Sequence, residues 1–285
     1  MKKYIPYLQI LLSASLWGVI GLFNRHFSAL GFSARSIVMV RNFGGLLMMT
    51  LIFALIDRSV FKIKVKHLPW FFCTGVISVL VFTLCYFLCQ QRCSLAVAAI
   101  LLYTAPAFVV VLSALLFKDA ITKRKLAALG LAFLGCTFVS GIWSGGLTVT
   151  GAGLLVGICS GFFYGLYSIF ARYALRHYKP LTVTYYTFVF AGISSLFVAK
   201  PAEVMTLIRP ALIVTVIAFI LLCTVLPYIF YTAGLAKVDS GRASIIASVE
   251  PVVAALVGVA AFGEPMTLMI VLGLGCILAT VYLLR

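Results

Sequence analysis

The chain contains a series of apolar runs, each about 20 residues long, and this feature limits its fold more than any other. A helix of about 20 apolar residues is long enough to cross a hydrocarbon core about 30 Å thick. The runs predict ten spans, at 5–24, 35–56, 68–90, 94–117, 123–143, 151–171, 181–200, 209–233, 242–262 and 266–284. We therefore expect an all-α membrane protein with ten transmembrane helices.

Charged residues are too few for a soluble fold. They make up 10% of the 285 residues, whereas a soluble domain carries about 25%. The segments between the spans are short, and the longest, at 57–69, leaves no room for a soluble domain. The net charge of +16 does not indicate nucleic-acid binding, because the basic residues lie in small groups between the apolar runs. We expect membrane lipid as a partner and no nucleic acid.

The distribution of lysine and arginine predicts which way the spans face. With both termini in the cytoplasm, the inner segments hold 16 of the 22 basic residues and the outer segments hold five. The remaining one, Arg41, lies inside a predicted span. Because cytoplasmic loops carry an excess of basic residues, this distribution predicts a multi-pass protein of the cytoplasmic membrane with both termini inside.

The two halves of the chain resemble each other at a nearly constant offset. The stretch YTAPAFVVVLSALLFKDAIT at 103–122 aligns with SVEPVVAALVGVAAFGEPMT at 248–267, an offset of 145 without a gap. Near the start of each half, LWGVIGLFNR at 16–25 matches FYGLYSIFAR at 163–172, an offset of 147. The offset of 145 also relates pairs of single residues: Pro106 and Pro251, Asp119 and Glu264, Thr122 and Thr267, Tyr86 and Tyr231.

This similarity predicts two repeats, residues 1–145 and residues 146–285, with five spans each. Because five is an odd number, the second repeat must enter the membrane the opposite way up. Two inverted repeats that meet near the bilayer midplane are the architecture of secondary transporters, in which one repeat moves against the other around a central site.

The repeated block of small residues, a proline, an apolar run, an acid and a threonine resembles the EamA family of the drug/metabolite transporter superfamily. The resemblance covers nearly the whole chain and is carried by SLWGVIGLFNR at 15–25, VRNFGGLL at 40–47, AVAAILLYTAPAFVVVLSALLFKDAIT at 96–122 and RASIIASVEPVVAALVGVAAFGEPMT at 242–267. It implies two inverted five-helix repeats, a central cavity and the export or exchange of a small metabolite. In one minor departure, Lys118 and Asp119 stand where the family commonly has Gly-Glu.

Glu250 is an acidic residue placed well inside a predicted span. A charge at mid-span costs about 2.5–3.5 kcal/mol on insertion scales. Small residues share its helix face, at Ala243, Ala247, Ala254 and Ala261. Pro251 removes a backbone donor beside it, and both features favour a position facing the interior of the bundle. Glu250 then binds a substrate amine or carries a coupling proton; the alternative is a structural ion pair with Arg41 or another cation.

Arg41 and several aromatic residues are the other candidates for substrate binding. Arg41 either binds a substrate carboxylate or extends its charge toward the outer surface. Together with Glu250, it would suit a zwitterion such as an amino acid, or a related amine. Tyrosine and tryptophan combine an apolar face with one polar group, which suits the walls of a metabolite site, although they are also common at membrane interfaces. The candidates within predicted spans are Trp17, Tyr86, Tyr103, Tyr164, Tyr228 and Tyr231.

Prolines and turn acids are expected to shape the helices rather than to bind substrate. Proline interrupts helical hydrogen bonding, so the candidate hinges are Pro106, Pro227 and Pro251. Asp119 and Glu264 each lie in a tight turn, three residues ahead of a threonine that can cap the next helix. We interpret these two acids as structural, because acids near a helix N-terminus are favoured by the helix dipole.

Other classes of protein fit the sequence less well. The chain has no G-x-x-x-x-G-K-[ST] phosphate loop and no H-E-x-x-H zinc motif, so we expect no enzyme, no ATP-driven pump and no cofactor. Cys85, Cys89 and Cys93 share one helix face, but without a nearby histidine we interpret them as small apolar residues rather than a metal site. A passive channel or a non-transporting membrane scaffold is the alternative; a channel would be expected to carry rings of repeated charged residues.

Overall fold

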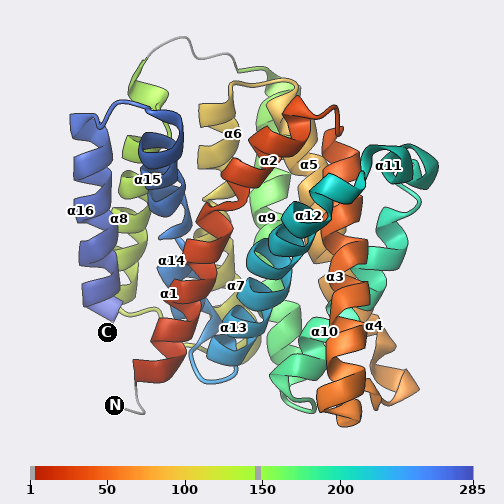
Figure 1. Cartoon of the computed structure of the whole chain (residues 1–285). Coiled ribbons are helices and arrows are strands. Elements are labelled where there is room, and N and C mark those ends of the chain that lie inside the picture. Colours follow the sequence, from red (N-terminus) through yellow and green to blue (C-terminus); the bar gives the residue numbers. More distant parts are fainter. Residues whose placement is uncertain (1–3, 145–148, 285) are drawn as a thin grey trace.

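A computed structural model describes residues 4–144 and 149–284, which form a helical bundle without strands (Figure 1). Before residue 145 the elements are α1 (Ile5–Gly18), α2 (Ile20–Ala29), α3 (Ala34–Ile56), η2 (Arg58–Phe61), η3 (Val65–His67), α4 (Leu68–Phe72), η4 (Cys73–Val81), α5 (Phe82–Gln90), α6 (Leu95–Leu102), α7 (Ala105–Phe117), α8 (Lys123–Val139) and η5 (Ile142–Ser144). After residue 148 they are α9 (Gly151–Leu175), α10 (Pro180–Ser195), α11 (Pro201–Leu207), η6 (Pro210–Leu212), α12 (Ile213–Ile220), η7 (Leu221–Val225), α13 (Leu226–Leu235), α14 (Ser240–Ala247), α15 (Glu250–Phe262) and α16 (Leu268–Leu284).

The predicted all-α membrane fold is confirmed, and seven of the ten predicted spans are confirmed within the described residues. These seven helical segments are long and apolar enough to cross a membrane: Ile5–Ala29, Ala34–Ile56, Val65–Gln90, Leu95–Phe117, Gly151–Leu175, Pro210–Leu235 and Ser240–Phe262. The other three predicted spans correspond to shorter helices, α8 and α16 with 17 residues each and α10 with 16. At about 1.5 Å per residue they cover roughly 25 Å, somewhat less than the hydrocarbon core.

Two of the long spans are interrupted at matching positions. The helix α6 ends at Leu102 and α7 begins at Ala105, whereas α14 ends at Ala247 and α15 begins at Glu250. These boundaries differ by 145 residues, the offset of the sequence repeat. In each case a proline lies in the first turn of the second half-helix, where its missing N–H is not needed. Pro106 and Pro251 therefore lie at helix interruptions.

The third candidate hinge, Pro227, lies in the first turn of α13, directly after the π-helical segment η7. The first half has a longer π-helical segment, η4, at the corresponding place. There, Phe82 occupies the position that corresponds to Pro227. Because both segments are π-helical, the widened helix at this level does not depend on proline.

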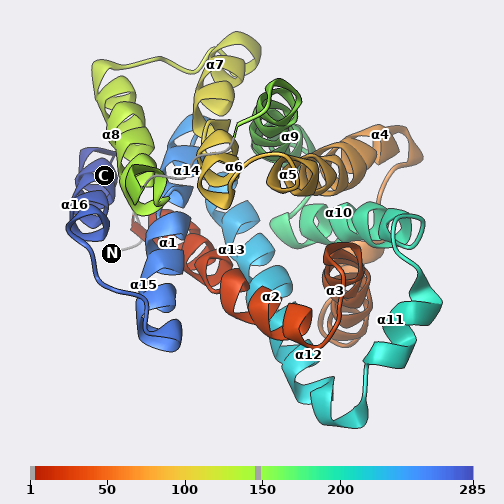
Figure 2. The same ribbon diagram turned by 90° about the horizontal axis from the view of Figure 1, so that it is seen from above.

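The two halves of the chain interlock. The first helix of the first half, α1, packs against α13, α14 and α15 of the second half. The first helix of the second half, α9, packs against α5, α6 and α7 of the first half. Seen from above, α8 and α16 lie side by side at one edge of the bundle, and α3 and α10 at the other (Figure 2). The centre therefore lies between elements of both halves.

Glycine makes the two central crossings close. A Cβ atom on Gly18 would lie 2.8 Å from the carbonyl oxygen of Glu250, and one on Gly165 would lie 3.2 Å from that of Ala105. Gly18 and Gly165 correspond at the offset of 147, and Ala105 and Glu250 at the offset of 145. Each half thus brings a glycine of its first helix onto the start of the interrupted half-helix of the other half. This contact holds the backbone of Glu250 against α1.

Candidate functional site

A cavity of about 390 Å³ lies in the middle of the bundle. Its walls come from both halves: α1, α2, α3, α5 and α6 of the first, and α9, α13 and α15 of the second. The cavity extends to Arg25 and Leu95, whose side chains are exposed. Arg25 belongs to α2 and Leu95 begins α6, and both helices reach the end of the bundle opposite to the start of α1 and the end of α16 (Figure 1). We call this the open end, and the end where α1 starts and α16 ends the closed end.

Glu250 presents its carboxylate to this cavity. It is the first residue of α15, where the positive end of the helix dipole favours a negative charge. The Tyr164 hydroxyl donates a hydrogen bond to Glu250 Oε2 at 3.2 Å. Tyr86 and Tyr103 lie close enough to interact electrostatically with the carboxylate. Within the described residues Glu250 forms no ion pair.

Arg41 lies on α3 and also lines the cavity. Its guanidinium group approaches the Tyr228 hydroxyl and Cys223, while its buried Nε has no hydrogen-bond partner in the described part of the chain. The guanidinium does not come within 4.0 Å of the Glu250 carboxylate. The direct ion pair considered as an alternative is therefore not formed. Both groups face the same cavity and interact electrostatically without contact.

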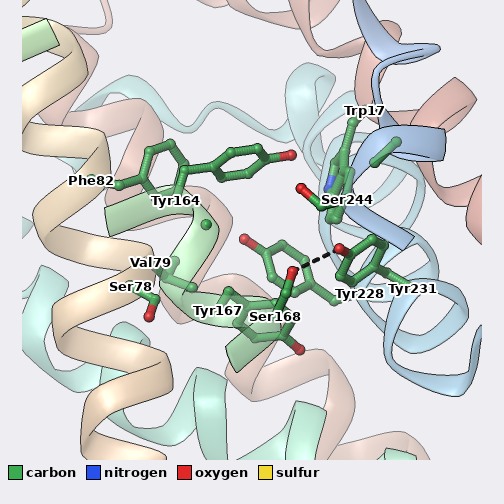
Figure 3. A pocket seen from close by; sticks show the side chains of 12 residues that line it. Trp17, Ser78, Val79, Phe82, Tyr164, Tyr167, Ser168, Tyr228, Tyr231 and Ser244 are labelled. Atoms are coloured by element: carbon green, nitrogen blue, oxygen red, sulfur yellow. Dashed lines mark hydrogen bonds between the residues drawn. The ribbon is translucent and has the colours of Figure 1, made fainter. Parts of the chain in front are cut away.

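Four aromatic side chains form the floor of the cavity, and Figure 3 shows them in the lining of a second pocket that adjoins it. Trp17, Phe82, Tyr164 and Tyr228 line both the cavity and a smaller pocket of about 20 Å³ on its closed-end side. The ring of Trp17 lies edge-on to that of Tyr228 with a centroid separation of 5.1 Å, and Phe82 and Tyr164 are also 5.1 Å apart. This layer separates the wide part of the cavity from the closed end.

A layer of hydrogen-bonded side chains lies next to this floor, toward the closed end. The hydroxyls of Ser168 and Tyr231 are 2.7 Å apart (Figure 3), and those of Tyr167 and Thr232 are also 2.7 Å apart. The hydroxyl of Ser240 donates to the carbonyl of Ser168 at 3.2 Å. All five side chains are buried. We call this set the polar layer.

An ion pair closes the bundle beyond the polar layer. Lys125 Nζ on α8 lies 3.0 Å from Oδ1 of Asp239, and the Lys125 side chain is only 5% exposed. Asp239 also accepts a hydrogen bond from the backbone N–H of Arg242 and so caps α14. The charge pair and the cap together join α8 of the first half to α14 of the second.

The turn acids Asp119 and Glu264 do more than the sequence indicated. The threonine caps are confirmed, since Thr122 Oγ1 accepts from the Lys125 N–H at 3.2 Å and Thr267 Oγ1 accepts from the Ile270 N–H at 3.3 Å. The acids themselves, however, bind arginines of the opposite half: Asp119 binds Arg172 and Glu264 binds Arg25. The sequence interpretation rested on their place before a helix N-terminus. The sequence offset relates acid to acid and arginine to arginine, so it does not show which arginine meets which acid.

The surroundings of Asp119 change its titration. Burial raises the pKa of its carboxyl, but hydrogen bonds from Arg172 and Ser113 lower it by more, so the pKa lies below the ordinary value of 3.8. Asp119 lies outside the spans, in the turn between α7 and α8. The pair with Arg172 is therefore charged at neutral pH.

Most of the predicted binding residues lie together. Those that line the cavity are Trp17, Arg41, Tyr86, Tyr103, Tyr164, Tyr228 and Glu250. The remaining one, Tyr231, belongs to the polar layer and lines the smaller pocket instead. Sequence reasoning missed four polar side chains of the cavity: Asn24, Arg25, Thr83 and Gln90. Thr83 and Gln90 lie three residues before and four residues after Tyr86, on one helix face, so Tyr86 was the signal that could have identified them.

The cysteines of α5 pack against another helix. Cys89 and Cys93 are buried and lie beside Gly157 and Gly153 of α9. Residues 4–144 and 149–284 contain no group of three or more histidine, cysteine, aspartate or glutamate side chains that could hold a metal ion. The positions of Cys89 and Cys93 match this packing against α9.

Comparison with known proteins identifies the family of the chain. The chain matches the model of the EamA-like transporter family twice, over residues 4–141 and 151–285. Two relatives from Archaeoglobus fulgidus, both described as uncharacterized transporters, are 29% and 30% identical to it. The first alignment covers 99% of this chain and 98% of the relative, and the second covers 95% and 93%.

A more distant relative and a solved structure agree with this. The uncharacterized transporter YyaM of Bacillus subtilis is 24% identical, over 70% of this chain and 67% of its own length. A solved structure, described only as the crystal structure of a protein, superimposes with a TM-score of 0.80 at 17% identity. It covers 98% of this chain and 95% of its own, and it therefore has the same fold.

Proposed function

Because the chain belongs to the EamA-like transporter family of the drug/metabolite transporter superfamily, we propose that it is a secondary carrier of an amino acid or a related amine, working by alternating access. As a member of a transporter family it is a multi-pass membrane protein with a small-molecule substrate. The proposal adds the class of substrate, the mechanism, and the direction, which is export or exchange across the cytoplasmic membrane.

The observation that carries the proposal is the pair of separate charges in one cavity. Glu250 and Arg41 both face the cavity without forming an ion pair with each other. Each charge at this depth costs about 2.5–3.5 kcal/mol, which a bound group of opposite charge would offset. A zwitterion supplies both groups, with its amine at Glu250 and its carboxylate at Arg41. The tyrosines and Trp17 then enclose the remainder of the substrate, and an aromatic face also attracts an amine.

The closed end supports a carrier rather than a passive channel. The aromatic floor, the polar layer and the Lys125–Asp239 pair lie in succession between the cavity and the closed end. In the proposed mechanism these layers open when the open end closes. With both termini in the cytoplasm, as the distribution of basic residues predicts, the state described here is open to the outside. A coupling proton, if one is used, would be carried by Glu250.

The repeat supports the same mechanism. We infer that residues 1–145 and 146–285 are two repeats of inverted topology, because their interrupted helices and close crossings correspond at offsets of 145 and 147. In such a pair, each repeat can adopt the arrangement that the other has. Exchange of the two arrangements would move the opening from one end of the bundle to the other. A membrane scaffold would need neither the cavity nor its unpaired charges.

Counterflow in proteoliposomes tests this function. Vesicles with purified protein are loaded with one unlabelled amino acid or amine at a time, and uptake of the same labelled compound is measured. We expect saturable, counterflow-stimulated uptake for a subset of zwitterions. Glu250→Gln keeps the size of the side chain but removes its charge, and should abolish the signal. Glu203→Gln, an exposed acid on α11, is the matched control and should transport normally.

Two results would contradict the proposal. If flux rises linearly with concentration and is not stimulated by substrate on the opposite side, the protein is a channel. If folded Glu250→Gln transports as well as the wild type, the carboxylate takes no part in binding.

A further inference from the structure

Among the described residues, four ion pairs join the halves of the chain, and two of them correspond to each other, one at each end of the bundle. At the closed end, Arg172 of α9 binds Asp119, which follows α7. At the open end, Arg25 of α2 binds Glu264, which follows α15. Each pair links an arginine near the end of the first span of one half to an acid of the other half. We call them the closed-end pair and the open-end pair.

The two pairs correspond residue by residue. Arg25 and Arg172 differ by 147 positions, and Asp119 and Glu264 differ by 145. The arginine also covers an aromatic ring in each case: Arg172 lies 4.2 Å from the centroid of Phe117 and Arg25 lies 4.2 Å from that of Phe262. These two phenylalanines again differ by 145.

The backbone before each acid is also the same. Lys118 and Gly263, which correspond at the offset of 145, are both left-handed, with φ of 59° and 66°. In both turns the N–H of the acid donates to a carbonyl six residues earlier, from Asp119 to Ser113 at 3.4 Å and from Glu264 to Gly258 at 3.3 Å. A left-handed cap of this kind ends a helix and fixes the direction of the residue that follows. The two turns therefore present their acids in the same way.

The strength of the pairs differs, however, and the difference follows the opening of the cavity. At the closed end both Nη atoms of Arg172 bind Asp119, with Nη2 to Oδ1 at 3.0 Å, and the side chains are 26% and 15% exposed. At the open end a single contact of 2.6 Å joins Arg25 Nη2 to Glu264 Oε1, and the side chains are 58% and 43% exposed. A bidentate, half-buried pair is stronger than a single contact in solvent.

One residue adds to this difference. The Ser113 hydroxyl donates to Asp119 and accepts from Arg172 Nη1 at 3.2 Å. The corresponding residue at the open end is Gly258, which has no hydroxyl. The Glu264 carboxylate folds over Gly258 instead, so that a Cβ atom there would lie 3.1 Å from Glu264 Cδ. The open-end pair thus lacks a hydrogen-bonding partner that the closed-end pair has.

We propose that the two pairs are latches that strengthen and weaken in turn, and that the stronger closed-end latch holds the unloaded protein in the state whose cavity faces the open end. This inference rests on the proposed alternating access. When the halves exchange their arrangements, the open-end pair becomes the enclosed bidentate one, and the closed-end pair becomes a single exposed contact. In the second state the enclosed pair has Gly258 where the closed-end pair has Ser113, and it therefore lacks the hydrogen bonds of the serine hydroxyl. The second state is for this reason the less stable of the two.

Hydrogen exchange measured by mass spectrometry in lipid nanodiscs tests the latches without any substrate. The closed end is followed in peptides around 113–126 and 170–180, and the open end in peptides around 20–30 and 258–270. We expect Asp119→Asn to increase exchange at the closed end and to decrease it at the open end, because the population moves to the opposite state. Loss of a hydrogen bond to a charged group corresponds to about a tenfold or larger shift in the ratio of the two states.

Further variants separate a latch from a merely local contact. Ser113→Ala should shift the ratio in the same direction by about three- to tenfold. The charge exchange Asp119→Arg with Arg172→Asp should restore the wild-type pattern. Arg176→Gln is the control, since Arg176 also faces the Phe117 ring, at 5.3 Å, but forms no ion pair within the described residues. Its pattern should match that of the wild type.

The proposal is overturned if hydrogen exchange increases at the mutated end and does not change at the other end. The pairs would then be local structural contacts that do not respond to the state of the cavity. If Asp119→Asn does not fold, Ser113→Ala decides by the same criterion. The counterflow assay is read separately. If hydrogen exchange changes in opposite directions at the two ends but no compound is transported, the latch proposal holds and the proposed carrier function is wrong. If a compound is transported but hydrogen exchange at the two ends is not coupled, the carrier function holds and the latch proposal is wrong.

Discussion

The two central helix crossings of this protein have the same backbone geometry but carry different side chains. At one, Gly18 of α1 meets the backbone of Glu250; at the other, Gly165 of α9 meets the backbone of Ala105. Glu250 faces a cavity of about 390 Å³, whereas Ala105 is completely buried. The close crossing therefore occurs twice, while the carboxylate occurs once. Geometry and chemistry are separable here, and each can be altered alone.

A carboxylate placed at the Ala105 crossing should have the largest effect on stability. Ala105→Glu would bury a carboxylate where no cavity or cation receives it within the described structure, and we expect it to lower the free energy of unfolding by about 3 kcal/mol or more. Ala105→Gln has the same size without the charge. The difference between the two variants in thermal unfolding isolates the charge. Equal stability of the two would mean that the Ala105 crossing is as hydrated as the one at Glu250.

A larger residue at Gly18, which would force the helices of that crossing apart, should have the next largest effect on stability. A methyl group in Gly18→Ala would collide with the Glu250 carbonyl and with Val253, so we expect a loss of about 1–3 kcal/mol in stability. Gly21→Ala is the control, because a Cβ atom there meets nothing within 4 Å. Thermal unfolding of both variants in the same detergent gives the comparison. If Gly18→Ala is as stable as Gly21→Ala, the two helices are free to separate.

The hydrogen bond to Glu250 should contribute less. Tyr164→Phe removes the donor at 3.2 Å from Oε2 but keeps the ring in the cavity floor. We expect the substrate concentration for half-maximal counterflow to change by about three- to tenfold, with stability nearly unchanged. Tyr185→Phe, whose hydroxyl lies away from the cavity near Thr50, is the control. An unchanged half-saturation in Tyr164→Phe would show that this hydroxyl does not orient the carboxylate during binding.

The smallest expected effect is the pH dependence of the closed-end pair. The pKa of Asp119 lies below its ordinary value of 3.8, so the pair contributes stability above that value and loses it as the pH falls through the lower pKa of the folded protein. Wild type and Asp119→Asn should therefore differ by a constant amount, about 1 kcal/mol, between pH 5 and pH 7. Below about pH 4 the difference should shrink. A difference that already disappears near pH 6 would contradict the charged pair.

Much of the site followed from residue type and position. A carboxylate beside a proline in an apolar run has few physical explanations, and this predicted an inward-facing Glu250. Arg41 and five of the six aromatic candidates line the same cavity, because polar groups within spans are costly unless they face the interior. Tyr231 was predicted on the same grounds but lies in the polar layer, since its hydroxyl finds Ser168. Sequence spacing does not say which interior surface a tyrosine reaches.

The ion pairs between the halves required the structure. The sequence relates Arg25 to Arg172 and Asp119 to Glu264, but the partners that meet are Arg25 with Glu264 and Arg172 with Asp119. Which arginine reaches which acid depends on how the first helix of one half crosses the other half. The separation between Arg41 and Glu250 is of the same kind, because it depends on the width of a cavity whose walls come from both halves.

The amino-acid sequence by itself determined that the chain lies in a lipid bilayer, that it is all-helical, which family it belongs to and how deep its charged residues lie in the spans. These are properties of runs and spacings along one chain, and the cost of moving a polar group into lipid makes them nearly independent of distant contacts. The tertiary structure alone decided which end of the cavity is open, which crossing is enclosed and which ion pair is bidentate. Those depend on the relative position of two similar halves, and the packing of nearly equivalent surfaces can differ between states while the sequence stays the same.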